Sequence, residues 1–273
     1  YVIPGNHDFG AGENDFKIND FVTTYADFGY DKAIEKIEGT GTYTANLGNK
    51  YRLIAFDSND PNRSTGDGVS KEEIDRLVND GVDIIMLPYF KTVEEVKTFV
   101  KLVDGRAKTD LLFETPQAVE LVDEILSVDG IDEVHIGLND LHLGYGLTFM
   151  FELFSNGVVD KLCEAFKRHN VPYGIGGIAA LGKGALPAEF VIAEHYRLGS
   201  TCAILSRSFC NLKDINDSVE FRDVFSKSLV NTRNFENKLL NENQDYFEQN
   251  RELVCKIISK IVNEIKEKNA SRE

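Results

Sequence analysis

The chain has 273 residues, 42% of them hydrophobic and 27% charged, which is ordinary for a folded globular protein. Its formal net charge of -15 at pH 7 repels nucleic acid and anionic membrane surfaces, so we expect neither as a partner. No apolar stretch approaches the roughly 20 residues that cross a bilayer, and no signal peptide is recognised. These features predict a cytoplasmic protein.

The first 70 residues follow no regular rhythm. The chain begins inside what reads as a strand, YVIPGNHD, which predicts that it is a fragment or that its natural N-terminus is missing. TYTANLGNKYRLIAFDS predicts an antiparallel hairpin with a turn at Gly48 and Asn49. The loop-rich residues 59–68 predict a seam between two parts of the chain.

A regular alternation of strands and helices is predicted after residue 70. Continuous apolar strands that alternate with amphipathic helices are typical of parallel strands buried on both faces. The pattern predicts an α/β fold: a (β/α) barrel of TIM type, incomplete at its N-terminus because five of eight strands are visible. An open doubly wound sheet is the alternative, but no GxGxxG follows the first strand. The predicted strands are residues 83–90, 109–115, 133–141, 172–179 and 201–209.

Helix starts are marked clearly in this region. Ser70 with Glu73, and Thr92 with Glu95, have the spacing of capping boxes. Thr115 can cap a helix whose first position is Pro116.

Residues 217–267 predict two long helices. A stripe at helical spacing could pack on the chain's own body or on a neighbouring subunit, and the pattern leaves both open. The stripe comprises Leu253, Val254, Ile257, Ile258, Ile261 and Ile265. The domain prediction is therefore residues 1–68, a β/α barrel core over 69–212, and C-terminal helices over 213–273.

The four cysteines fit no zinc-site spacing and stand in apolar or helical stretches. We expect reduced, buried thiols. They are Cys163, Cys202, Cys210 and Cys255.

Two acids stand where predicted parallel strands end. Glu114 closes the apolar run LLFE, and Asp140 follows the next strand in EVHIGLND. Because adjacent parallel strands deliver their ends to the same rim, the two carboxylates should lie close together. Hard oxygen ligands suit Mg²⁺ or Mn²⁺, which can stabilise an enolate formed from a ketone.

FETP, HIGLNDLHLGYG, PYGIGGIA, LPAEFVIAEHYRLGS and AILSRSF resemble the aldolase/citrate lyase family of pyruvate- and phosphoenolpyruvate-binding TIM barrels, over about residues 70–265. The resemblance implies that Glu114 and Asp140 bind Mg²⁺ or Mn²⁺. It also implies that the backbone of Gly137, Leu138 and Asn139 holds the carboxylate of a 2-oxoacid. The implied activity is carbon–carbon lyase chemistry on a 2-oxoacid or an acyl-CoA substrate. The implied partner is a second copy of the chain, joined through C-terminal helices that swap between subunits.

The chain also departs from this family. Earlier strands of the family supply an Arg that grips the substrate carboxylate and a His for proton transfer, and neither motif precedes residue 71. Arg52 and Arg63 are the only arginines there, and neither stands in the family's pattern. A Schiff-base mechanism is disfavoured because no lysine stands inside the predicted strands.

VIPGNHDFG resembles the GNHD block of metallophosphoesterases, which makes residues 1–65 similar to a fragment of such an enzyme. The resemblance implies a metal ligand at Asn6 and a catalytic His7 oriented by Asp8. No GHxH occurs among the five histidines, so the binuclear site cannot be completed by this chain. A phosphoesterase fragment and an inactive oligomeric remnant are the alternatives to a lyase.

The remaining polar residues have two interpretations each. His135 is a core or rim histidine, and His142 could contact substrate or a water molecule. Gly174, Gly176 and Gly177 could cradle a phosphate or only let strands pack closely. Glu189 and His195 have a surface or packing role, and Arg207 faces the rim or a subunit contact.

Overall fold

The computed structural model describes residues 35–36, 43–47, 51–55, 70–210 and 218–271. The chain forms two compact units, residues 1–85 and 86–273. The predicted division at residues 68 and 212 stays a prediction, and the GNHD block with His7 lies outside the described residues. No helix in the described ranges combines the length and the apolar character that a membrane crossing needs.

In the first unit, β1 (Glu35–Lys36), β2 (Tyr43–Leu47) and β3 (Tyr51–Ala55) form an antiparallel sheet. Leu47 pairs with Tyr51, which confirms the predicted hairpin, while its turn residues are outside the described ranges. The helix α2 (Lys71–Asn79) begins with the predicted capping box, in which Ser70 and Glu73 bond reciprocally.

Five further strands form a sheet whose spatial order is their order along the chain. The β5–β6, β6–β7 and β7–β8 ladders are parallel. The described residues therefore confirm an α/β fold, and consecutive strands joined by helices are the unit from which β/α barrels are built. The strands are β4 (Ile84–Leu87), β5 (Lys108–Phe113), β6 (Glu133–Ile136), β7 (Tyr173–Ile178) and β8 (Cys202–Leu205).

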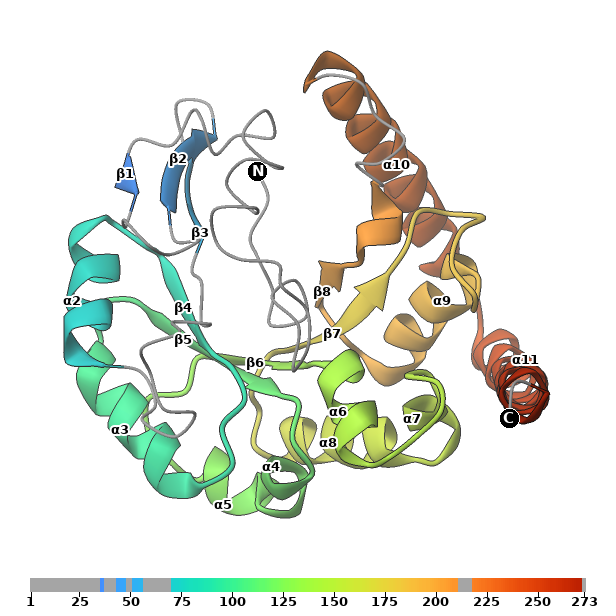
Figure 1. Ribbon diagram of the computed structural model, residues 1–273, viewed down its shortest axis with the longest axis horizontal. Helices are drawn as coiled ribbons and strands as arrows, with labels where there is room; N and C mark the ends of the chain where they lie inside the picture. The colour runs from blue at the N-terminus through green and yellow to red at the C-terminus, as the bar shows by residue number, and fades with distance from the viewer. Residues whose placement is uncertain (1–34, 37–42, 48–50, 56–69, 211–217, 272–273) are drawn as a thin grey trace. The chain divides into compact units, whose positions relative to one another are not determined.

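Helices follow each of these strands (Figure 1). The capping box of Thr92 and Glu95 begins α3, and Thr115 caps α4 with Pro116 in its first turn, both as predicted. The helices are α3 (Val93–Val103), α4 (Pro116–Glu120), α5 (Val122–Leu126), α6 (Leu138–Gly144), α7 (Glu152–Ser155), α8 (Val158–Arg168), α9 (Ala188–Leu198), the 3₁₀ helix η2 (Arg207–Phe209), α10 (Ser218–Leu239) and α11 (Gln244–Ala270).

Several boundaries differ from the predictions. The helix expected after residue 115 breaks at Leu121 into α4 and α5. Strand β6 ends at Ile136 rather than near residue 141, because Gly137 makes the last link to β5 and its carbonyl already accepts the first bond of α6. Strand β8 ends at Leu205 and continues as η2.

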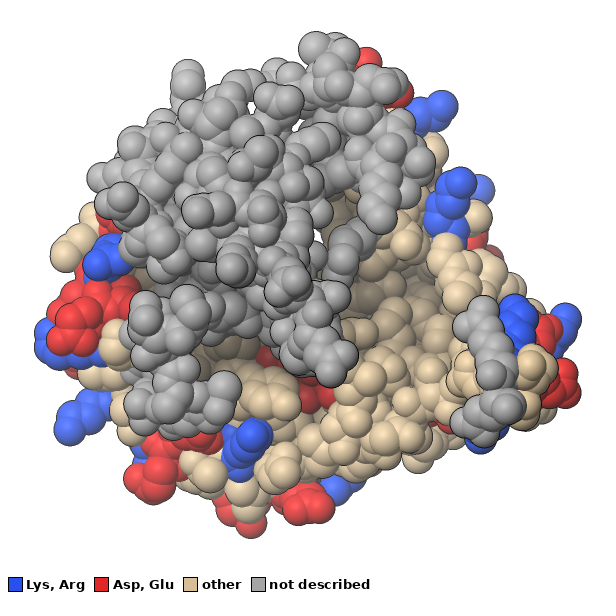
Figure 2. All heavy atoms as spheres, viewed as in Figure 1, with Lys and Arg blue, Asp and Glu red and all other residues tan. Residues whose placement is uncertain are grey.

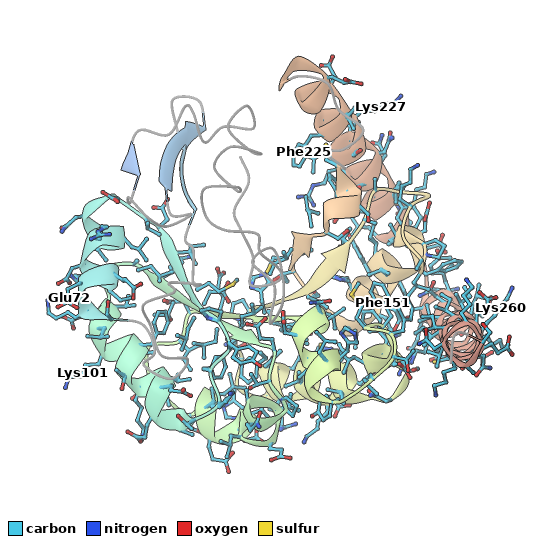
Figure 3. The ribbon with its side chains drawn as sticks, in the orientation of Figure 1. Glu72, Lys101, Phe151, Phe225, Lys227 and Lys260 are labelled. Atoms are coloured by element: carbon cyan, nitrogen blue, oxygen red, sulfur yellow. The ribbon has the colours of Figure 1, made fainter. Side chains whose placement is uncertain are left out.

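One face of the sheet is a packed apolar core. Phe113 on β5 lies edge-on to Phe90, 5.1 Å between ring centroids, and contacts Phe166 of α8 at 5.3 Å. Phe166 in turn contacts Tyr173 of β7, so α8 covers this face. In Figure 3 the labelled Phe151, which is buried, lies among the elements of this unit, whereas Lys101 and Lys260 point outward.

The opposite face of the sheet carries polar side chains. Because side chains alternate along a strand, the neighbours of Leu111 and Phe113 on β5 point away from α8. This second face carries Asp110 and Leu112, and the strand pairing continues it through His135, Gly174 and Cys202. A sheet covered by helices on both sides would carry apolar residues there, so polar side chains at these positions require a separate explanation.

The C-terminal helix α11 packs on α9 and α7 of its own chain. Its buried face is Asn250, Val254, Ile258 and Val262, so part of the predicted stripe is correct, but Leu253 is 43% exposed. The fully buried Glu194 of α9 accepts a hydrogen bond from Asn250 at 3.0 Å. Exchange of this helix between subunits stays a prediction.

Candidate functional site

Glu114 follows the last residue of β5 and is only 7% exposed. Its Oε1 atom accepts a hydrogen bond from the backbone N–H of Tyr89, at 2.9 Å. The adjacent Thr115 donates its hydroxyl to the carbonyl of Phe90 at 2.7 Å, which ties the start of α4 to the loop after β4. Neighbouring strand ends thus hold this carboxylate in one place.

The residue that donates to Glu114 has an unusual backbone. Tyr89 has a φ of +53°, in the left-handed region that side chains other than glycine rarely adopt. This conformation costs roughly 1 kcal/mol or more and is retained where surrounding contacts require it. The Tyr89 ring is 54% exposed, and Lys91 places its ammonium 5.0 Å from the ring centroid. One aromatic ring and one positive charge therefore lie at the rim beside the acid.

Gly137 lies directly against Glu114. A Cβ atom on Gly137 would stand 2.7 Å from Oε2 of Glu114 and 2.8 Å from its Cβ, closer than real contacts allow. Glycine at this position thus leaves the space that the carboxylate occupies. Nearby, Gly144 packs on the ring of Pro116, which fixes α6 beside the start of α4.

Asp140 lies in the first turn of α6, one turn beyond the end of β6 at Ile136, rather than at the end of a strand as predicted. It is half-buried, and its charge acts on Glu114. Burial, and secondarily the negative charge of Asp140, raise the pKa of Glu114 to about 8, against the opposing effect of the Tyr89 N–H. A carboxyl group that is buried beside another acid resists ionisation unless a cation compensates the charge.

The pair fits a hard divalent cation. Two protein carboxylates leave most coordination positions to water and substrate oxygens, as Mg²⁺ sites usually do. Among the described residues, no group of three or more His, Cys, Asp or Glu side chains could hold a metal by itself. A cation held by Glu114 and Asp140 would therefore take its other ligands from beyond the described residues.

The other predicted substrate contacts lie on α6. Leu138 is buried and Asn139 is exposed, so their backbone, with that of Gly137, starts the helix beside Glu114. His142 directs its Nδ1 at the carbonyl of Asn139, and because a carbonyl only accepts, this nitrogen carries the proton. That contact commits Nδ1 to the helix backbone.

His135 does not join this group, and it has partners that the sequence did not reveal. Its Nδ1 lies 2.8 Å from Oδ2 of Asp110, and both residues are buried. Burial alone would lower the pKa of His135, but Asp110 and Cys202 beside the ring raise it to about 10. Asp110 could have been found from sequence as a polar residue inside the buried run TDLLF.

The remaining candidates serve the fold. A Cβ on Gly174 would overlap the His135 ring, and Gly177, with a φ of +97°, stands at an irregularity between β7 and β8. Glu189 accepts a hydrogen bond from the backbone N–H of Gly182 at 2.8 Å. Burial, with the charge of His135, lowers the pKa of His195 to about 3, so this ring is neutral. The side chain of Arg207 lies outside what the structure describes.

Residues 63–150 match the family described as HpcH/HpaI aldolase/citrate lyase. This stretch contains Glu114, Gly137 and Asp140, and the match confirms the resemblance predicted from FETP and HIGLNDL. No curated protein matches the chain.

Solved structures similar to the chain include an HpcH/HpaI aldolase from Desulfitobacterium hafniense DCB-2, with 19% identity, a TM-score of 0.45, and coverage of 60% of this chain and 69% of that one. A HpcH/HpaI aldolase/citrate lyase family protein from Burkholderia cenocepacia J2315 has 15% identity, a TM-score of 0.43, and coverage of 60% and 70%. RipC from Yersinia pestis has 12% identity, a TM-score of 0.44, and coverage of 56% and 69%.

Proposed function

We propose, from the aldolase/citrate lyase match over residues 63–150, that this chain carries the metal-binding half of a divalent-metal-dependent carbon–carbon lyase. The substrate would be a 2-oxoacid of pyruvate type or an acyl-CoA related to it. The sheet would be the second half of a TIM-type barrel. The observation that carries the proposal is the buried Glu114 beside the half-buried Asp140, whose negative charge adds to the raised pKa of Glu114.

Glu114 and Asp140 would hold Mg²⁺ or Mn²⁺. When bound, such a cation supplies a Lewis acid that stabilises an enolate next to a carboxylate. The N–H of Tyr89 fixes the orientation of Glu114, and Gly137 keeps the adjacent space free of side-chain atoms.

The first turn of α6 supports the predicted role of Gly137, Leu138 and Asn139 in holding the substrate carboxylate. The rim adds an exposed ammonium on Lys91, which would attract an anionic substrate to a chain of net charge -15. Figure 2 shows that charged side chains of the described surface gather mostly along its outer edges.

A homo-oligomer through the C-terminal helices also remains a proposal. It is supported by large apolar side chains that α10 and α11 expose, among them Val230 at 57% and Leu253 at 43%. Single exposed apolar residues are ordinary, so the oligomeric state must be measured directly. The cytoplasmic location likewise stays a prediction.

Metal binding and oxaloacetate decarboxylation test the proposal. Purified protein is titrated with Mn²⁺ and then assayed with oxaloacetate at pH 7.5. We expect Mn²⁺-dependent decarboxylation that falls by about a hundredfold or more in Glu114→Gln, because one of two protein ligands is lost. Glu124→Gln, the same change at an exposed position on α5, is the matched control and should leave both measurements unchanged.

Proton competition gives a second readout. Because the pKa of Glu114 is raised to about 8, binding should strengthen as the pH rises from 6 to 8.5 and the proton leaves. If Mn²⁺ binds equally to the parent and to Glu114→Gln at every pH, the assignment of Glu114 as a ligand is wrong. If no Mn²⁺-dependent rate appears above the background, the lyase proposal is wrong for this chain.

A further inference from the structure

A second group of reactive residues lies on the polar face of the sheet, in the middle of the strands and away from Glu114. Strand pairing places His135 of β6 opposite Gly174 of β7, and Gly174 opposite Cys202 of β8. These three positions form one row across the sheet. On β5 this row continues at Leu112, and Asp110 lies two residues earlier on the same face of the strand, with its Oδ2 atom 2.8 Å from Nδ1 of His135.

Gly174 allows the side chains on either side of it to meet. A Cβ atom on this residue would lie 2.3 Å from Nε2 of His135 and 2.8 Å from the sulphur of Cys202. The imidazole and the thiol therefore share the space that a side chain at position 174 would fill. A glycine between a histidine and a cysteine thus creates a direct imidazole–thiol contact.

The three side chains differ in their exposure to solvent. Asp110 and His135 are 2% and 7% exposed, whereas Cys202 is half-buried on a strand whose next three residues are exposed. The contact between Asp110 and His135 is close enough for an ion pair but is not a well-aligned hydrogen bond, and Oδ1 of Asp110 has no hydrogen-bond partner among the described residues. The acid and the base are thus enclosed, and the sulphur is the accessible end of the row.

We propose that Asp110, His135 and Cys202 form a thiolate–imidazolium site in which Cys202 reacts with small, soft electrophiles. Asp110 stabilises the positive charge on His135, and the imidazolium stabilises the negative charge on the sulphur. This arrangement is the usual means of activating a cysteine, with an acid that orients the base. The site is independent of the proposed metal centre and of its substrate.

The charges that act on the ring support this assignment. Asp110 and Cys202 favour the imidazolium, and the pKa of His135 is raised to about 10 despite burial. His195 on α9 is the other titratable group coupled to it and is neutral, with a pKa of about 3. Glu133, two residues before on the same strand, is half-buried. Among these groups, none carries a second positive charge that would displace the proton from His135.

The reaction balances without an external oxidant. With an alkylating reagent, the sulphur of Cys202 forms a bond to carbon, the carbon–halogen bond breaks, and the halide leaves with its electron pair. The proton that the thiol once held stays on His135. With a small organic disulfide the same attack forms a mixed disulfide and releases a thiolate.

Site-resolved alkylation tests the proposal in the full chain. The folded protein is treated with iodoacetamide from pH 5.5 to 9, and the modification rate of each cysteine is measured by peptide mass spectrometry. We expect Cys202 to react about tenfold faster at pH 7 than Cys255 of α11, which is also half-buried. Burial raises the pKa of Cys163 to about 12, so it should stay unmodified.

The variant His135→Gln should slow the alkylation of Cys202 about tenfold at pH 7, with the rate of Cys255 unchanged. Circular dichroism and the protection of Cys163 report whether the variant is folded. The rates in the parent protein decide the question even if the variant does not fold. If Cys202 in the parent reacts no faster than Cys255 at pH 7, or if folded His135→Gln reacts as fast as the parent, the proposal is wrong.

Discussion

The sheet holds buried acids at two levels, and they differ in what stands beside them. At the strand ends, Glu114 lies near a second acid, Asp140. In the strand middles, Asp110 lies 2.8 Å from an imidazole nitrogen of His135. The first pair brings two acids together, whereas the second pairs an acid with a base. Nearly equal burial of Glu114 and Asp110 therefore accompanies acid–acid coupling in one place and a self-contained ion pair in the other.

The largest expected effect comes from breaking the self-contained pair. Asp110→Ala should lower the free energy of unfolding by about 3–5 kcal/mol, because it leaves His135 buried without its partner. The folded-state pKa of His135 is above its ordinary value, so the contribution is complete below pH 6.5 and is lost as the pH rises through about 10. Urea denaturation at pH 7 and at pH 10.5 measures both values. A cost below 1 kcal/mol at pH 7 would contradict the ion pair.

Replacing Gly174, the glycine between His135 and Cys202, should also lower the free energy of unfolding. Gly174→Ala places a methyl group 2.3 Å from the His135 ring and should cost about 1–3 kcal/mol, because the packed ring cannot move freely. Gly176→Ala is the matched control two residues along the same strand, where the nearest atom would be 3.5 Å away. Its cost should stay below about 1 kcal/mol. Equal costs for the two variants would mean that the row is not closely packed at Gly174.

The sequence indicated the two acids near the strand ends but not the group of Asp110, His135 and Cys202, and the reason is physical. Glu114 and Asp140 stand at changes from apolar to polar chain, which are visible without knowing which strands pair. The group of Asp110, His135 and Cys202 depends on strand register. The three residues are 25 and 67 positions apart in sequence and meet only through strand pairing. His135 alone gave no indication of its partners.

Helix starts were predicted correctly where a side chain bonds the backbone, as at Thr92 and Thr115. The sequence predicted Asp140 at the end of a strand rather than in a helix, because the apolar run IGL continues across the end of β6. Only the backbone bond from Gly137 to Phe113 shows where the strand stops. Long-range contacts of this kind override a local apolar pattern.

At the strand ends, replacing the buried carboxyl group of Glu114 should raise the free energy of unfolding, whereas replacing Asp110 should lower it. The pKa of Glu114 is raised, so the folded state binds a proton more tightly than the unfolded state between pH 4.5 and about 8, and stability falls as the pH rises through that window. Without added metal, Glu114→Gln should therefore be more stable than the parent by about 2–4 kcal/mol at pH 8.5 and nearly equal at pH 4.5. Thermal unfolding in chelator measures the difference. Destabilisation at pH 8.5 would show that the ionised carboxylate is already compensated.

The variant with the smallest expected effect, Asp140→Asn, separates the two causes of the raised pKa of Glu114. Burial is the larger cause and the charge of Asp140 the smaller, so Asp140→Asn should lower the pKa of Glu114 below 8 but leave it above the ordinary 4.5. The corresponding change in stability at pH 8.5 is about 1 kcal/mol or less. Carboxyl ¹³C chemical shifts of labelled glutamate, followed against pH in chelator, report the titration of Glu114 directly. Burial persists in this variant because Tyr89, Gly137 and the start of α4 still enclose the carboxyl group. A return to the ordinary pKa would therefore mean that the second acid, rather than the enclosure, makes this strand end receptive to a cation.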